Sequence, residues 1–171
     1  MCGIVGYVGH RDCLPILIEG IKRLEYRGYD SAGVAVEDGT GLKVVKAAGK
    51  IRSLEAKLQT GAPVGTFGIA HTRWATHGEP NDLNAHPHTD EKCTVALVHN
   101  GIIENYKELK AELEALGYRF ESETDTEVVA HLVARYLVEE PDLLGAVQRA
   151  VGRLTGAYSL GVISRHEPGR L

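Results

Sequence analysis

Thr66-Phe-Gly-Ile-Ala-His-Thr72 and Cys93-Thr-Val-Ala-Leu-Val-His99 are two short apolar runs, each typical of a buried β-strand. Between them, residues 73–91 form a polar segment that shows neither a strand nor a helix pattern. An irregular segment of that length inside a compact domain is usually functional. The two runs therefore predict a pair of core strands with a functional loop between them.

The sequence before Thr66 predicts a strand, a helix, a hairpin and a second short helix. Residues 4–8 are apolar, and Asp12 is a typical N-cap for a helix with Pro15 in its first turn. Two β-rich runs, residues 33–36 and 42–47, are joined by Glu-Asp-Gly-Thr-Gly, whose glycines suit a tight turn. The apolar positions at helical spacing are Leu14, Leu17, Ile18, Ile21 and Leu24 in the first helix and Ile51, Leu54 and Leu58 in the second.

The sequence after His99 predicts three helices and a closing strand. Asn105 and Glu108 resemble a capping box at the start of the first helix, and Gly117 ends it. Two amphipathic helices follow over residues 126–138 and 142–154, and residues 157–164 form the last strand. Strands thus occur in antiparallel-looking pairs with helices grouped between them. This order favours an α+β layered sandwich over a doubly wound sheet.

Composition predicts a single soluble domain. The 171 residues are 43% hydrophobic, which suits one compact core. The formal charge is -4 and like charges are not clustered, which argues against nucleic acid and anionic membrane as partners. No apolar run approaches the ~20 residues of a membrane-spanning helix, and the N-terminus lacks the pattern of a secretory signal. We therefore expect a cytoplasmic protein.

The three cysteines, Cys2, Cys13 and Cys93, form no C-x-x-C pair and indicate neither a disulfide framework nor a zinc knuckle. Cys13 and Cys93 lie in apolar runs and are expected to be buried. Cys2 differs, because removal of Met1 would place a thiol and a free α-amine on one residue. Unperturbed, an α-amine titrates near ~7.7–8.0 and a thiol near ~8.5, so the amine can take the thiol proton. Cys2 is therefore a candidate N-terminal nucleophile, with a chance cysteine at position 2 as the alternative.

A cation, an aromatic ring and hydrogen-bonding side chains follow the first core strand in His71-Thr-Arg-Trp-Ala-Thr-His77-Gly. Burying such a mixture is costly without a ligand or partners. Arg73 can bind a carboxylate with two hydrogen bonds, Thr76 can orient it, and Trp74 can cover a small site. A salt bridge for Arg73 and a core position for Trp74 are the structural alternatives.

Two polar sites follow the second core strand. In His99-Asn100-Gly101, an Asn amide and a Gly backbone N–H can point at the same place and form an oxyanion hole, although Asn-Gly is also a common turn. In Ser-Glu-Thr-Asp-Thr-Glu, Asp125 can bind a substrate ammonium or cap the following helix. The residues alone leave both pairs of alternatives open.

Five histidines, His71, His77, His86, His88 and His99, lie within 29 residues and raise the alternative of a metal site. Their spacing matches no established zinc pattern such as H-E-x-x-H, and no carboxylate pair is obviously placed with them. We therefore expect no metal and no other cofactor.

Together these stretches resemble the class II glutamine amidotransferases, a family with an N-terminal nucleophile. Tyr29 and Trp74 indicate the hexosamine branch, whose enzyme aminates fructose 6-phosphate, because the purine-pathway branch has Gln where this chain has Tyr29. The alternatives are a non-catalytic fragment that only binds glutamine or a partner chain, and an ammonia donor for another class II amidotransferase. The matching segments run through nearly the whole chain in the family's order, and they are residues 2–6, 23–33, 68–78, 84–87, 98–105 and 122–127.

The resemblance implies L-glutamine as substrate and a role for each candidate residue. Cys2 is then the nucleophile and, through its α-amine, the base, while Asn100 and the Gly101 N–H form the oxyanion hole. Arg73 binds the α-carboxylate of glutamine and Asp125 binds its α-ammonium. The remaining assignments are Trp74, in the loop that closes over glutamine, and Thr76 and His77 beside the substrate. The implied reaction releases ammonia and hydrolyses a Cys2 thioester without a metal.

The fold implied by the resemblance is a four-layer α/β/β/α sandwich of antiparallel sheets, the N-terminal nucleophile hydrolase fold. Residues 1–171 are expected to form the glutaminase domain, incomplete at its C-terminus. The full-length enzyme is expected to be a homodimer whose sugar isomerase module receives the ammonia. A sheet edge left bare by missing strands would favour pairing with another copy. Met1, if retained, would lock the Cys2 amine in a peptide bond and make the chain an inactive precursor.

Overall fold

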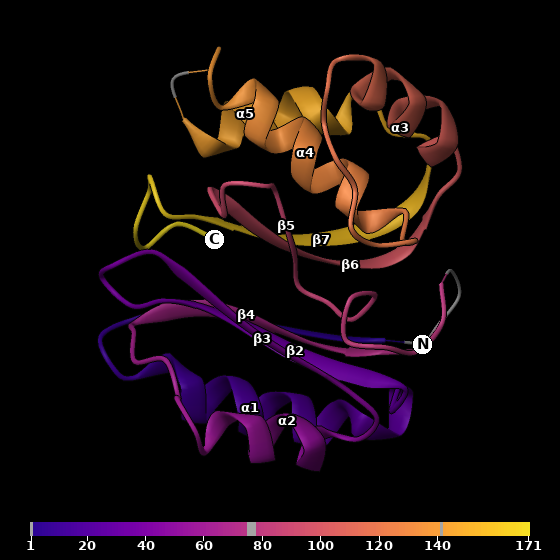
Figure 1. Cartoon of the computed structure of the whole chain (residues 1–171). Helices are drawn as coiled ribbons and strands as arrows, with labels where there is room; N and C mark the ends of the chain where they lie inside the picture. Colours follow the sequence, from indigo (N-terminus) through magenta and orange to yellow (C-terminus); the bar gives the residue numbers. More distant parts are fainter. Residues whose placement is uncertain (1, 75–77, 141) are drawn as a thin grey trace.

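The computed structural model describes residues 2–74, 78–140 and 142–171, which form four layers in the order helices, sheet, sheet, helices (Figure 1). α1 and α2 cover the outer face of one sheet, and α3, α4 and α5 cover the outer face of the other. The strands are β1 (Gly3–Val8), β2 (Ser31–Glu37), β3 (Leu42–Ala48), β4 (Phe67–Arg73), β5 (His88–Thr89), β6 (Val95–Ile103) and β7 (Gly156–Ser164). The helices are α1 (Cys13–Leu24), α2 (Ile51–Leu58), α3 (Tyr106–Ala115), α4 (Thr126–Tyr136) and α5 (Leu143–Val151). The predicted α/β/β/α sandwich is confirmed.

The first sheet has the strand order β1-β4-β2-β3, and its pairs are antiparallel. β1 begins opposite the end of β4, with Gly3 paired to Thr72. β2 begins at the same end, with Ser31 paired to Arg73. Cys2, one residue before β1, therefore lies beside the segment that follows Arg73.

The second sheet has the order β5-β6-β7, and its central strand β6 extends past the predicted end at His99 to Ile103. Asn100 and Gly101 both pair with β7, so the alternative of an Asn-Gly turn is wrong. The φ angle of Gly101 is +118°, and a Cβ there would lie 2.1 Å from the carbonyl oxygen of Ala157. Only glycine fits this position, because the pairing with β7 holds the backbone in a conformation that L side chains rarely adopt.

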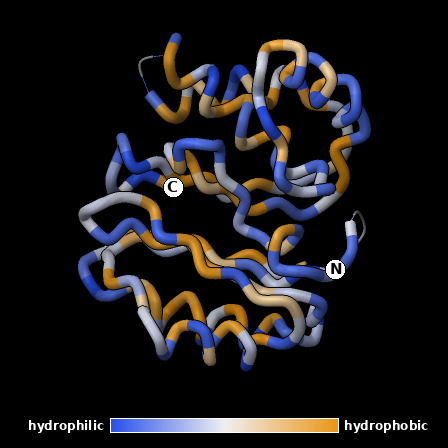
Figure 2. Tube along the Cα trace, viewed as in Figure 1, coloured by the Kyte–Doolittle hydropathy of each residue, from blue (hydrophilic) through white to orange (hydrophobic). Residues whose placement is uncertain are grey.

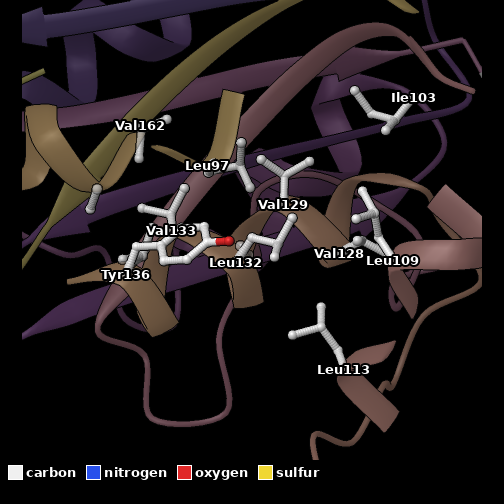
Figure 3. Close-up of a cluster of buried hydrophobic side chains, with 14 of the residues drawn as sticks. Leu97, Ile103, Leu109, Leu113, Val128, Val129, Leu132, Val133, Tyr136 and Val162 are labelled. Atoms are coloured by element: carbon white, nitrogen blue, oxygen red, sulfur yellow. The ribbon is translucent and has the colours of Figure 1, made fainter. Parts of the chain in front are cut away.

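Two apolar clusters lie between the sheets and their helices. In Figure 3, Val129, Leu132 and Val133 of α4 gather beneath Leu97 of β6, within the larger cluster. The second cluster joins α1 and α2 to the first sheet, with Leu17, Ile21 and Leu54 among its members. Figure 2 shows hydrophobic stretches, in orange, along the strands at the centre. Each pair of a sheet and its helices therefore has its own core.

A third apolar cluster fills one end of the space between the two sheets, where Phe67 and Ile69 of β4 meet Ala96 of β6. Side chains alternate along a strand, so positions 67, 69, 71 and 73 of β4 share one face. Along this face the residues change from apolar to polar, because His71 and Arg73 follow Ile69. The polar end of this face is the end at which Cys2 lies.

The helices lie within a few residues of their predicted positions. The Asp12 carboxylate caps α1 by accepting a hydrogen bond from the Leu14 N–H at 3.2 Å. At the end of α3, Gly117 has a φ of +94° and the Tyr118 N–H donates to the Leu113 carbonyl at 3.0 Å. Within the described ranges, no helix is both long and apolar enough to cross a membrane.

The structure departs from the local predictions for Asn105 and Cys93, and the segment predicted to be irregular contains the short strand β5. Asn105 occupies the N-cap position of α3 but makes no capping hydrogen bond, because its side-chain amide donates to the Arg153 carbonyl at 2.8 Å and accepts from the Thr155 N–H at 2.9 Å. Cys93 is exposed, because it lies in the turn before β6 with a φ of +48°. Both residues lie in connections next to β6. Asn105 follows β6 and is bonded to the segment before β7, and Cys93 lies in the turn before β6. Cys13 is buried, as expected.

Candidate active site

A cavity of about 620 Å³ is lined by segments that are far apart in the sequence. Cys2 precedes β1, Arg73 ends β4, Asn100 and Gly101 belong to β6, and Asp125 directly precedes α4. The other lining residues are Arg27, Trp74, His86, His99, Ile102, Ala157, Tyr158 and Ser159. Every predicted site residue within the described ranges therefore lines this one cavity.

Cys2 is tied to the backbone that follows β4 and to a side chain of β6. The Trp74 N–H donates to the Cys2 Sγ at 3.1 Å, and the thiol donates to the Trp74 carbonyl at 3.6 Å. The carbonyl of Cys2 accepts a hydrogen bond from the Asn100 Nδ2 at 3.2 Å. The sulfur is half-buried at the cavity wall, so it is both positioned and accessible to a small ligand.

The turn before β2 supports the same segment from the other side. A Cβ at Gly28 would lie 2.8 Å from the carbonyl carbon of Arg73 and 2.9 Å from the Trp74 nitrogen. The Asp30 N–H donates to the Arg73 carbonyl at 3.0 Å. Glycine at position 28 therefore permits a close approach that fixes Arg73 and Trp74 between this turn and Cys2.

Arg73 places a nearly buried cation in the cavity wall, with only 3% of its surface exposed. Burial lowers the pKa of Arg73, while the nearby Cys2, Asp125 and Asp30 act in the opposite direction. Its Nη2 donates to the Gly78 carbonyl at 3.4 Å. A guanidinium held in this way is suited to bind a carboxylate, because its planar fork matches the two carboxylate oxygens.

Asp125 places a carboxylate in the same wall and is 4% exposed. Its Oδ2 accepts from the Ile103 N–H at 2.8 Å, and its Oδ1 lies 3.8 Å from the Nδ1 of His99. The side chain makes no capping hydrogen bond to α4, so the capping alternative is wrong. The Glu127 carboxylate fixes this segment by accepting from the N–H of Ser122 at 2.7 Å and from its hydroxyl at 2.6 Å.

Trp74 lies at the surface of the site, with 46% of its area exposed, so the alternative of a core position is wrong. Its ring meets Tyr29 in a T-shaped contact with 5.6 Å between ring centroids. Thr76 and His77 lie outside the described residues, and their placement beside a substrate stays a prediction.

Four buried histidines lie at the cavity, where His86 and His99 line the wall and His71 and His88 lie next to His86. The ring of His86 is 4.4 Å from that of His71, 4.8 Å from that of His88 and 6.4 Å from that of His99, measured between centroids. Burial lowers the pKa of His71 to about 4 and that of His88 to about 3, so both rings are neutral at pH 7. In the described part of the chain, no group of three or more His, Cys, Asp or Glu residues is arranged to hold a metal ion.

Two parts of the site do not follow from the residue patterns. Ala157, Tyr158 and Ser159 line the cavity because β7 pairs with β6, and this pairing joins segments that are more than 50 residues apart. The sequence predicted a last strand over residues 157–164, and a strand needs a neighbouring strand to pair with, but the sequence did not identify that neighbour as β6. His71 also makes a hydrogen bond to Asn100, although the sequence marked it only as a candidate metal ligand.

The chain is similar to known proteins both in sequence and in fold. Residues 71–171 match the family described as "Glutamine amidotransferase domain". The chain is 59% identical over 172 residues to the glutamine–fructose-6-phosphate aminotransferase [isomerizing] of Aquifex aeolicus, and 52% identical over 171 residues to that of Clostridium tetani. Each alignment covers 100% of this chain and 28% of the relative, so the chain spans little more than a quarter of these proteins.

Solved structures show the same fold. Glutamine phosphoribosylpyrophosphate (PRPP) amidotransferase from B. subtilis superposes with a TM-score of 0.79 at 30% identity, over 96% of this chain and 35% of that one. A structure of the allosteric regulatory enzyme of purine biosynthesis gives 0.82 at the same identity and coverage. The chain is thus more similar in sequence to the fructose-6-phosphate aminotransferases than to these two structures, in line with the branch that Tyr29 and Trp74 indicate. The family match covers more than half of the chain, and the chain therefore belongs to the glutamine amidotransferase domain family.

Proposed function

We propose that this domain hydrolyses L-glutamine to glutamate and ammonia, with Cys2 as the nucleophile after removal of Met1. The observation that supports this function best is the convergence of Cys2, Arg73, Asn100 and Asp125 on one cavity. A cation and a carboxylate can bind the α-carboxylate and the α-ammonium of an amino acid. A thiol can attack its side-chain amide, and an amide N–H donor can stabilise the oxyanion that forms. Family membership supports the same substrate.

The two charges of the cavity match the two charges of a free amino acid. Arg73 binds the α-carboxylate of glutamine through its guanidinium, and Asp125 binds the α-ammonium. This arrangement directs the side-chain amide of the substrate toward Cys2. Trp74 covers the substrate from the solvent side, where it already contacts Tyr29. Thr76 and His77 are expected to contribute to glutamine binding, as the resemblance to the family implies.

The reaction begins when the free α-amine of Cys2 takes the proton of its thiol. The thiolate attacks the amide carbon and forms a tetrahedral intermediate with a negative oxygen, which Asn100 Nδ2 and the Gly101 N–H stabilise. The α-ammonium of Cys2 then gives its proton to the amide nitrogen of the substrate. The carbon–nitrogen bond breaks, ammonia departs, and the thioester between Cys2 and the glutamyl group remains. A water molecule then attacks the thioester, which releases glutamate and restores the thiol.

We propose that residues 1–171 are the glutaminase domain of a longer enzyme. The relatives at 52–59% identity are named for fructose 6-phosphate and for isomerisation, which supports a sugar isomerase module as the recipient of the ammonia. From the resemblance to the family, we propose that the complete enzyme is a homodimer. All three cysteines are free, and a mechanism that needs a free thiol suits the reducing cytoplasm.

The test compares glutamate release by the wild-type chain with that by two cysteine variants, after mass spectrometry has confirmed loss of Met1. Cys2→Ala should abolish glutamate release and leave the far-UV circular dichroism spectrum unchanged. Cys93→Ala is the matched control, because its thiol is exposed and lies outside the cavity, and it should retain full activity. Glutamate release that survives in Cys2→Ala would remove Cys2 from the mechanism.

A further inference from the structure

His71 lies on the polar end of β4, facing the second sheet, with its ring directly behind Asn100. Its Nε2 is 2.9 Å from the Asn100 Oδ1 and 3.1 Å from the backbone carbonyl oxygen of His99. The imidazole is fully buried, and its ring contacts that of His86 with 4.4 Å between centroids and 33° between the ring planes. Both partners of Nε2 belong to residues that line the cavity, whereas His71 itself does not line it.

The partners of Nε2 determine which ring nitrogen carries the proton. A backbone carbonyl oxygen can only accept, so the hydrogen bond to the carbonyl of His99 requires a proton on the Nε2 of His71. Burial lowers the pKa of His71 to about 4, so the ring holds a single proton at neutral pH. The Nδ1 makes no hydrogen bond to a described residue, which agrees with an unprotonated nitrogen there. His71 is therefore a fixed donor.

A fixed donor determines the orientation of the neighbouring amide. The atom of Asn100 that faces the His71 N–H must be the oxygen, so the NH₂ group faces the other way. On that side Nδ2 donates to the Cys2 carbonyl at 3.2 Å and borders the cavity. In the flipped orientation, the NH₂ group would face the His71 N–H and an oxygen would face the cavity. Flipping would thus remove the donor from the site of the chemistry.

We propose that His71 is a positioning residue, which holds the Asn100 amide with its NH₂ group toward the cavity and so presets the oxyanion hole. This inference rests on the proposed glutaminase function. It explains why an imidazole occupies a fully buried position, two residues after Ile69 on the same strand face, where an apolar side chain would fill the space. Preset donors are effective because they need no reorganisation during the reaction.

Two substitutions of similar polarity separate positioning from simple packing. A Gln amide nitrogen reaches the place of the imidazole Nε2, whereas an Asn amide nitrogen reaches only the place of Nδ1. His71→Asn should lower kcat for glutamine by about 10- to 100-fold, less than complete loss of an oxyanion donor, and leave KM within about twofold. His71→Gln should recover kcat to within about fivefold of wild type. Equal losses in both variants, or a loss confined to KM, would overturn the proposal.

A double variant tests whether His71 acts through Asn100. Once Asn100→Ala has removed the amide, adding His71→Asn should change kcat by less than about twofold. Independent, multiplying losses would contradict the positioning role. The rate at which iodoacetamide alkylates Cys2 should be equal in all these variants, because alkylation requires no oxyanion hole. A slower alkylation in His71→Asn would show that the variant has disturbed Cys2 instead.

The tautomer can be measured without reference to activity. The ¹⁵N chemical shifts of the His71 ring in the wild-type chain should show a protonated Nε2 and a bare Nδ1 at pH 7. A proton on Nδ1, or a charged ring, would overturn the inference even if glutamine is hydrolysed. Conversely, an inactive wild-type chain with the expected tautomer would contradict the proposed function and leave the orientation of Asn100 intact.

Discussion

The two ends of the space between the sheets have opposite character, although the same strand faces form both. At one end, Ile69 of β4 packs against Val98 of β6 in an apolar cluster. At the other end, His71 of β4 meets Asn100 of β6 through a hydrogen bond. A step of two residues along each strand thus changes an apolar contact into a polar one.

The apolar end contributes mainly to stability, and the polar end contains the groups of the proposed site. Burying an Ile or Val side chain contributes roughly 1.5–3 kcal/mol to folding. A buried polar atom without a partner costs about 1–3 kcal/mol, and the polar end contains such atoms, for example the Nδ1 of His71 and of His86. The apolar end therefore stabilises the contact between the sheets, and the polar end uses part of that stability to hold a site.

The largest effect should come from a cavity at the apolar end. Ile69→Ala removes a fully buried side chain between the sheets and should lower the free energy of unfolding by about 2–5 kcal/mol. Urea denaturation measures this loss, and Ile69→Val should show a smaller one. In both variants, kcat per alkylatable Cys2 should stay within about twofold of wild type. A large fall in kcat with little change in stability would show that the two ends are not separable.

A smaller effect should come from the charge at the polar end. Asp125→Asn keeps an oxygen for the Ile103 N–H but removes the negative charge. The KM for glutamine should rise by about 10- to 100-fold, from the ~1.5–3 kcal/mol of a hydrogen bond to a charged group. Glutaramate lacks the α-ammonium, so wild type and Asp125→Asn should hydrolyse it equally. An unchanged KM for glutamine would remove Asp125 from the ammonium site.

The smallest effect concerns the pH dependence of stability. The folded chain holds the pKa of His71 at about 4, below the ordinary 6.5, so the unfolded chain binds more protons between these values. Stability is then fully present above pH 6.5 and falls as the pH is lowered toward 4, by about 1 kcal/mol per pH unit for this group. Urea titrations at pH 7 and pH 5 should therefore show a smaller fall for His71→Asn than for wild type. Identical falls would contradict a neutral buried His71.

Much of the fold could be predicted from the sequence, because its signals are local. The apolar spacing in residues 13–24, the cap at Asp12 and the glycines near residue 40 each determine the element in which they lie. Predictions were wrong or left open where a partner distant in sequence decides the structure. Asn100-Gly101 resembles a turn but is held in β6 by β7, and Asn105 is taken by the backbone of Arg153 and Thr155.

The site was predictable in its members but not in its connections. Cys2, Arg73, Asn100 and Asp125 were candidates because of their residue types, and the resemblance to the family implied a role for each. The hydrogen bond from His71 to Asn100 joins two strands of different sheets, 29 residues apart. No spacing in the sequence specifies which faces of two sheets meet, so this contact required the structure.

The most direct test of the central claim is the intact mass of the purified chain before and after exposure to 6-diazo-5-oxonorleucine, an electrophilic analogue of glutamine. A cavity that binds glutamine beside an activated Cys2 predicts a mass without Met1 that gains a single adduct, which peptide mapping places on Cys2. Excess glutamine should slow this labelling. A chain that has lost Met1 and gains no adduct, or that is labelled at Cys93 instead, would contradict the claim that this cavity is a glutaminase site.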